Sequence, residues 1–219
     1  MMQKPPPNYG SAFERSGALA SAIVAVAVAV AVIEWLEALT APSALRTYRD
    51  AITDRTPVSE IVTTYDLLKV PMAFAWIAAF VLTGLWLARA RRNADRIAPD
   101  QQRRSAVWVW LGWLVPVVSL WFPKQIVDDV WRSTVRDPGQ PNTGWWWGSW
   151  IAAQVLNAVA AQAFTITGEP RAGLLEILDL VELLAALATT IAVLQWIRVV
   201  RTLSRAQDTL ANTAPPSPW

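Results

Sequence analysis

The sequence predicts an all-α integral membrane protein, built as a bundle of four transmembrane helices. Hydrophobic residues make up 54% of its 219 residues and charged residues only 16%, which is too few to coat a soluble globule of this size. The apolar residues gather in long runs that approach the roughly 20 residues a helix needs to cross a bilayer. Because hydrocarbon cannot hydrogen-bond backbone N–H and C=O groups, helices are the expected spanning structure.

The first apolar run is expected to span the membrane over about 17–39. Lys4 and Arg15 precede it, as basic residues precede a secretory signal core, but the run ends at Glu34 and Glu37 without a clear small-residue cleavage motif. We therefore expect the segment to be retained as a helix. Its alternating Ala and Val residues imitate the period of a strand, yet a lone strand could not satisfy its backbone in lipid.

Further apolar runs complete one transmembrane domain over 17–205. The remaining spans are expected over about 70–88, 145–165 and 174–197. Gln154 and Asn157 in the third of the four spans are expected to hydrogen-bond across to neighbouring helices. The two ends of the chain, 1–16 and 206–219, are Pro-rich and are expected to be disordered.

The distribution of Lys and Arg selects four spans rather than five. Lys and Arg accumulate on the cytoplasmic side of spanning helices. If the apolar run 105–123 also crossed the membrane, only 9 of the 19 basic residues would be cytoplasmic. If it returns to the side it came from, or lies at the interface, 14 of the 19 are cytoplasmic. We therefore expect a multi-pass protein of the cell membrane with both termini in the cytoplasm.

The segment 105–136 is expected to be an interfacial or re-entrant element. Pro116 interrupts its apolar run, and a proline in a helix interior costs about 3 kcal/mol. Five Trp residues in this segment suit the level of the lipid headgroups. The pattern of 124–136 predicts an amphipathic helix, with Asp128 and Asp129 opposite its apolar stripe.

An ordered series of motifs gives the chain a family resemblance. The motifs are Trp86-Leu-Ala-Arg89-Ala-Arg91-Arg92-Asn93, Gly112-Trp113-Leu-Val-Pro116, Trp121-Phe122-Pro123, Asp129-Val-Trp131-Arg132 and Trp145-Trp146-Trp147. The series resembles the actinobacterial domain of unknown function 4328 family of membrane proteins over about 70–197. Ser119 departs from the pattern, because members of that family usually have Asn there. The resemblance implies a multi-spanning membrane protein, and it implies no activity because none is assigned to the family.

The first candidate site is a basic, Trp-rich face on the cytoplasmic side, which would contact lipid headgroups or a protein partner. Its arginines act as a topology signal, and each attracts anionic headgroups by about 1 kcal/mol near the surface. The alternative is a dedicated site for a lipid phosphate or for an acidic segment of a partner. The candidate residues are Arg89, Arg91, Arg92, Asn93, Trp113, Pro116, Trp121, Pro123, Trp131 and Arg132. This face makes a non-enzymatic scaffold or interaction protein the leading hypothesis.

The second candidate site is a group of acids at the outer ends of the first and last spans. Acids inside a spanning segment are costly and are functional candidates by default, so that this group could bind a cation or relay protons. The alternative is structural, since acids favour a helix N-terminus and since Arg46, Arg49 or Arg171 would pair with them. The candidate residues are Glu34, Glu37, Glu176, Asp179 and Glu182. Together with the helix broken at Pro116, this site makes a small transporter or ion-coupled channel the alternative hypothesis.

The composition argues against several other classes of function. The chain has no Cys and no His, which excludes thiolate chemistry, imidazole metal ligands and Ser-His-Asp triads. A net charge of +2 is too small to indicate nucleic-acid binding. We therefore expect no enzyme, no cofactor and no resident metal. The expected partners are the lipid bilayer and its anionic headgroups, with a membrane or cytoplasmic protein partner and a homo-oligomer left open.

Overall fold

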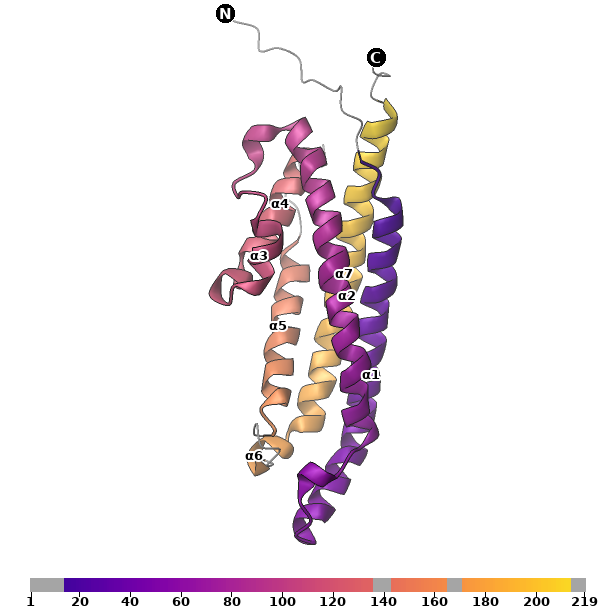
Figure 1. Ribbon diagram of the computed structural model, residues 1–219, viewed down its shortest axis with the longest axis vertical. Helices are drawn as coiled ribbons and strands as arrows, with labels where there is room; N and C mark the ends of the chain where they lie inside the picture. The colour runs from indigo at the N-terminus through magenta and orange to yellow at the C-terminus, as the bar shows by residue number, and fades with distance from the viewer. Residues whose placement is uncertain (1–13, 136–142, 165–170, 214–219) are drawn as a thin grey trace, which may run out of the picture. The chain divides into compact units, whose positions relative to one another are not determined.

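The computed structural model describes residues 14–135, 143–164 and 171–213, which form helices joined by short connections (Figure 1). No β-strand occurs in these ranges, so the predicted all-α class is confirmed. The chain forms two compact units. The carboxylate unit contains the described residues of 25–79 and 145–195, and the arginine unit contains those of 1–24, 80–144 and 196–219.

Three helices in the described ranges are long and apolar enough to cross a membrane: α1 (Gly17–Thr53), α2 (Thr64–Ile97) and α7 (Leu178–Thr213). The helix α5 (Gly144–Ala161), which covers most of the span we expected over 145–165, is not among them. At 1.5 Å per residue its 18 residues are about 27 Å long. Its composition explains its lower hydropathy, because one end is rich in Trp and the interior carries Gln154 and Asn157.

The long helices extend beyond the predicted spans. α1 continues through Pro42, and α7 continues to Thr213, so that 206–213, which we expected to be part of a disordered tail, are helical. The predicted tail residues 1–13 and 214–219 lie outside the described ranges. The short connections contain η1 (Val58–Glu60), η2 (Pro99–Gln101) and α6 (Ala172–Leu175).

The start of α2 is fixed by a reciprocal capping arrangement. The Thr63 backbone N–H donates to Asp66 Oδ2 over 2.7 Å, and the Asp66 N–H donates to Thr63 Oγ1 over 3.4 Å. Tyr48 on α1 donates its hydroxyl to the same carboxylate at 2.7 and 2.8 Å. With these bonds α2 starts at Thr64, before the start of the second span predicted at about residue 70. Tyr65 and Lys69 therefore lie on the first turns of α2.

The core of the carboxylate unit is built around small residues. Buried alanines of α1 and α5 pack beside larger side chains in this core. These residues are Ala41, Ala44, Ala51 and Ala160, with Leu45, Tyr48, Tyr65 and Val181. Alanine side chains let helices approach closely, and close packing is the main attraction between helices in lipid. The Trp35 indole N–H adds a hydrogen bond of 3.0 Å to Thr190, which ties α1 to α7.

The Trp/Pro segment of the arginine unit is a broken helix. α3 (Trp108–Leu114) stops at Val115, whose backbone is extended before Pro116, and the chain continues through η3 (Val117–Leu120) into α4 (Phe122–Thr134). α3 packs against α4 (Figure 1), where the Trp108 and Phe122 rings lie edge to face with centroids 4.7 Å apart. The seven residues of α3 are too few to span a bilayer.

A glycine positions this broken helix against α2. A Cβ atom built at Gly84 would lie 2.3 Å from the Trp110 ring, so only glycine leaves room for the indole. Phe80, one turn earlier on α2, meets the same ring edge to face at 5.7 Å. α4 is the amphipathic helix predicted over 124–136, with Asp128 and Asp129 opposite its apolar stripe, and both acids are nevertheless buried. This helix is covered on more than one side.

Candidate functional site

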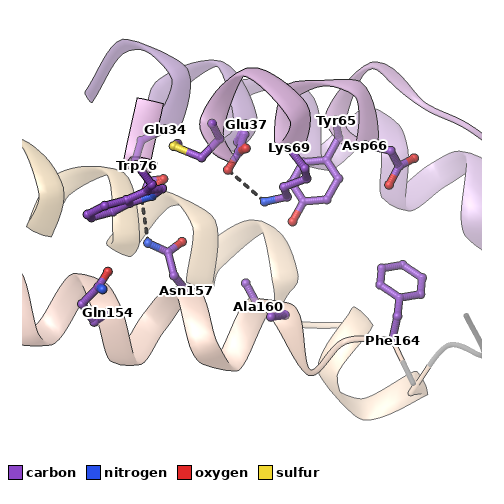
Figure 2. A pocket seen from close by; sticks show the side chains of 12 residues that line it. Glu34, Glu37, Tyr65, Asp66, Lys69, Trp76, Gln154, Asn157, Ala160 and Phe164 are labelled. Atoms are coloured by element: carbon purple, nitrogen blue, oxygen red, sulfur yellow. Dashed lines mark hydrogen bonds and ion pairs between the residues drawn. The ribbon is translucent and has the colours of Figure 1, made fainter. Parts of the chain in front are cut away.

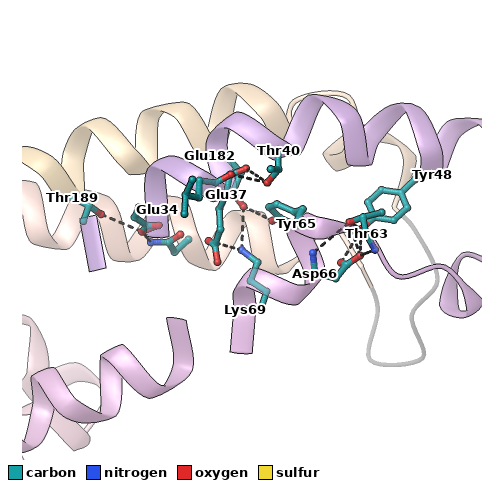
Figure 3. A network of polar contacts seen from close by, with 12 residues as sticks. Glu34, Glu37, Thr40, Tyr48, Thr63, Tyr65, Asp66, Lys69, Glu182 and Thr189 are labelled. Atoms are coloured by element: carbon teal, nitrogen blue, oxygen red, sulfur yellow. Dashed lines mark hydrogen bonds and ion pairs between the residues drawn. The ribbon is translucent and has the colours of Figure 1, made fainter. Parts of the chain in front are cut away.

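Three glutamates converge in the interior of the carboxylate unit (Figure 3). Glu34 and Glu37 are three residues apart on α1 and therefore share a face of that helix. Glu182 lies on the buried stripe of α7, one residue after Val181. One oxygen of each carboxylate lies within 4.8 Å of the others, and the residues are 1%, 1% and 0% exposed. We call these three residues the carboxylate centre.

Lys69 of α2 is the cation of this centre. Its ammonium nitrogen lies 2.9 Å from Glu37 Oε2 and 3.5 Å from Glu182 Oε1. It also lies 4.3 Å from the centre of the Tyr65 ring, one turn earlier on α2, and the Tyr65 hydroxyl donates to Glu182. The Lys69 side chain is 44% exposed, so the ammonium reaches buried acids from a partly open position.

Glu34 is bound only by neutral donors in the described residues. Asn157 Nδ2 of α5 donates to Glu34 Oε1 over 2.7 Å, which confirms that Asn157 bonds across to a neighbouring helix. The hydroxyl of Thr189 on α7 donates to the same oxygen over 3.2 Å. No Lys or Arg in the described ranges forms an ion pair with Glu34.

Each glutamate of the carboxylate centre keeps one buried oxygen without a hydrogen-bond partner among the described residues. These atoms are Glu34 Oε2, Glu37 Oε1 and Glu182 Oε2. Three carboxylates therefore share a single ammonium, and burying an uncompensated carboxylate costs several kcal/mol. Such a centre is expected to bind a further cation or protons.

A pocket of about 470 Å³ opens beside the carboxylate centre (Figure 2). Its volume falls within the range of small-molecule sites, roughly 300 to 1,000 Å³. α1, α2 and α5 each contribute to its wall. The lining residues are Glu34, Glu37, Tyr65, Asp66, Lys69, Met72, Trp76, Gln154, Asn157, Ala160, Ala161 and Phe164.

The other predicted acids do not join this centre. Glu176 lies in the connection between α6 and α7, where helical spacing does not apply, and it is exposed. Asp179 is exposed in the first turn of α7, and it accepts a hydrogen bond from the next backbone N–H. Of the expected arginine partners, Arg171 donates instead to Gln162 over 2.9 Å.

The sequence-based reasoning missed Lys69, Tyr65 and Thr189 as site residues. One signal in the sequence points to Lys69, because it is an isolated lysine that follows Tyr65 by one helical turn at the edge of an apolar run. Neither feature identifies Glu182 as the partner, which lies 113 residues further along the chain.

In the arginine unit, most of the predicted basic residues bind acids of the same chain. Arg92 forms two parallel bonds to Glu14, at 2.8 and 2.7 Å, and Arg89 Nε lies 3.2 Å from the same carboxylate. The hydrogen bond from Arg92 and the nearby positive charges hold the pKa of Glu14 below its usual value. Arg91 is buried and lies 3.6 Å from Asp95.

Asn93 is a buried hub of the arginine unit. Its side chain accepts from the Glu14 N–H at 3.1 Å and donates to the Glu14 carbonyl at 2.9 Å. It also donates to Gln207 of α7, which in turn donates to the Ala90 carbonyl and to Thr134 of α4. Because Asn93 is 0% exposed, its role is to join the segment before α1 to three helices.

The remaining members of the predicted basic face are divided between the interior and the surface. Arg132 and Arg103 both bind Asp129, which is 1% exposed. Pro123 is buried in the first turn of α4, and Trp113 and Trp131 are half-buried. Pro116 and Trp121 are exposed at the break between α3 and α4.

Comparison with known proteins places the chain in a family without assigning the centre a role. No curated protein and no solved structure matches it. The sequence model of a domain of unknown function, DUF4328, matches residues 49–174. The match includes Tyr65, Lys69 and Asn157, but it begins after Glu37 and ends before Glu182. Since the match covers more than half of the sequence, the chain belongs to the DUF4328 family.

Proposed function

We propose that this chain is a four-span protein of the cell membrane, with both termini cytoplasmic, and that it is a small ion-coupled transporter. In this proposal the carboxylate centre holds the coupling cation, and the protein is not an enzyme. α1, α2 and α7 supply three spans and α5 the fourth. The observation that carries the proposal is the convergence of three fully buried carboxylates on one lysine.

The donor set favours a hard inorganic cation. Carboxylate and amide oxygens are the ligands that Na⁺, Mg²⁺ and Ca²⁺ prefer in proteins. The carboxylate centre offers three unpartnered oxygens, and Asn157 lies beside it. Ionisable residues in a spanning segment are rare, and they mark ion and proton pathways. A proton would satisfy the same oxygens, so the experiment below compares it with metal ions.

The scaffold role predicted from the sequence receives less support. Its basic face would need free arginines, but Arg89 and Arg92 bind Glu14, and Arg132 binds Asp129. The exposed residues of this region are instead largely apolar, and they support contact of the broken helix with lipid at an interfacial or re-entrant position. These residues are Leu111, Leu114, Val117, Leu120 and Trp121.

The transport proposal is tested with the purified chain in proteoliposomes on a solid-supported membrane. Jumps in Na⁺, Ca²⁺ or proton concentration should displace charge, and one of the three ions should give a saturable current. Glu182→Gln should abolish that current, because it removes a carboxylate without changing shape. Glu176→Gln, an exposed acid outside the centre, is the matched control and should behave as wild type. Equal currents from both variants would falsify the proposal.

The topology is tested separately with single cysteines, since the native chain has none. Thr56, Ser105 and Thr202 are exposed positions that a thiol reagent can reach. With an impermeant maleimide in intact cells, only the cysteine at position 56 should be labelled. Labelling at 202 from outside would mean an odd number of spans and would remove the basis for the four-span arrangement.

A further inference from the structure

The pocket beside the carboxylate centre is larger than a metal ion requires. About 470 Å³ accommodates a small organic molecule, and its wall combines two kinds of surface. Met72 and Trp76 are four residues apart on α2 and supply an apolar face, to which Phe164 adds a further ring. Glu34, Gln154 and Asn157 supply polar side chains to the same pocket (Figure 2).

The polar part of the wall carries several hydrogen-bond acceptors. Glu34 Oε2 is buried without a partner among the described residues. Asn157 uses its amide N–H on Glu34, which leaves its carbonyl oxygen as an acceptor, and Gln154 brings a second side-chain amide to the pocket. A primary ammonium group has three N–H donors, and these three side chains offer three acceptors.

The charge of the wall selects a cation. Glu34, Glu37 and Asp66 line the pocket against the single ammonium of Lys69, so an anionic ligand would be repelled. Lys69 itself shows which group this environment stabilises. Its ammonium lies between two carboxylates and 4.3 Å from the Tyr65 ring centre, the arrangement by which aromatic sites recognise organic cations.

We propose that the pocket binds a small primary amine, with its ammonium at Glu34 and its apolar part against Trp76 and Met72. The proposal rests on the transport function proposed above, because the amine would be the transported substrate. It assigns Glu34 to the substrate, whereas Glu37 and Glu182, which already share Lys69, hold the coupling cation. Net charge agrees with this division, since three carboxylates and one lysine leave two negative charges for a monovalent ion and an ammonium.

Calorimetry on the full chain in nanodiscs tests the proposal with 3-phenylpropylamine as the probe and 3-phenylpropanol as its neutral counterpart. The amine should bind with one-to-one stoichiometry. The alcohol should bind at least about 10-fold more weakly, because it lacks the charge-assisted bonds to Glu34. Empty nanodiscs measure the partition of each probe into lipid, which is subtracted.

Two variants locate the binding. Glu34→Gln keeps an oxygen for Asn157 and Thr189 but loses the charge, and it should weaken amine binding about 10-fold or more. Ala161→Trp fills the pocket from an exposed position at the end of α5, so the core stays intact while binding is lost. Glu176→Gln should bind the amine as the wild type does.

The outcomes separate this proposal from the proposed function. Amine binding that survives both Glu34→Gln and Ala161→Trp, or that the alcohol equals, overturns the amine site. If the amine does not bind while ion jumps still give currents that depend on Glu182, the amine site fails and ion coupling stands. If the amine binds through Glu34 but no ion gives a current, the site stands and the coupled transport fails.

Discussion

The two units of the molecule treat buried acids in opposite ways. In the arginine unit, Asp129 is 1% exposed and has two guanidinium partners, Arg103 and Arg132. In the carboxylate unit, three equally buried acids have one cationic partner among the described residues, Lys69, which contacts Glu37 and Glu182 but not Glu34. A buried charge is therefore not by itself a sign of function. What distinguishes the carboxylate centre is its deficit of positive charge among the described residues, and the proposed function rests on that deficit.

Asp129 is the acid whose neutralisation should destabilise the folded protein most. We expect Asp129→Asn to lower the free energy of unfolding by about 3 kcal/mol, because two arginines lose a buried anionic partner. Denaturant unfolding followed by Trp fluorescence measures the change. Asp54→Asn, an exposed acid of the carboxylate unit, is the control for the loss of one charge. A loss below about 1 kcal/mol would show that Asp129 is not the structural acid described here.

The corresponding change in the carboxylate unit removes the ammonium. Lys69→Met should lower the free energy of unfolding by about 2 kcal/mol, less than a fully buried pair because Lys69 is partly exposed. Arg46→Met, which removes an exposed cation of α1, should change stability by no more than about 0.5 kcal/mol. Adding a saturating coupling cation should restore part of the loss in Lys69→Met, and an absence of rescue would argue against a shared cation site.

Neutralising one acid of the carboxylate centre should have the opposite sign. Glu182→Gln leaves an oxygen for Tyr65 and Lys69 and removes one of three like charges, so we expect a gain of about 1 kcal/mol. Thermal unfolding at pH 7.5 without added divalent cations gives the difference from wild type. If Glu182→Gln loses as much stability as Asp129→Asn, the two units do not differ in the way proposed.

The smallest expected effect is a pH dependence at Glu14. Its pKa is lowered in the folded protein, chiefly by the hydrogen bond from Arg92, so the stabilisation is present above the unfolded-state pKa and is lost as the pH falls through the lowered folded-state value. Hydrogen exchange at the Glu14 amide, which is bonded to Asn93, should therefore lose protection in acid after correction for the intrinsic rate. Glu14→Gln should show no such pH step, and a step that persists would have another origin.

The sequence predicted the elements of this molecule better than their partners. A proline inside a Trp-rich run was enough to predict the break at Pro116, since one residue causes it. The position of Glu34, Glu37 and Glu182 at the outer ends of the first and last spans predicted that they lie at one depth. The convergence with Glu182 and Lys69 depends on packing between residues that are far apart in sequence, which periodicity does not report. For the same reason periodicity did not predict that Asp128 and Asp129, opposite the apolar stripe of α4, are buried.

The reach of Lys69 has a kinetic consequence. The residue extends from α2 on a flexible four-carbon chain, and nearly half of its side chain is accessible. Withdrawing its ammonium from Glu37 and Glu182 needs only rotations about side-chain bonds, which occur in picoseconds to nanoseconds at accessible positions. In the proposed transport cycle, release of this ammonium therefore requires no helix to move. A slow step of that cycle would lie in opening the buried carboxylate oxygens to another cation rather than in the release of Lys69.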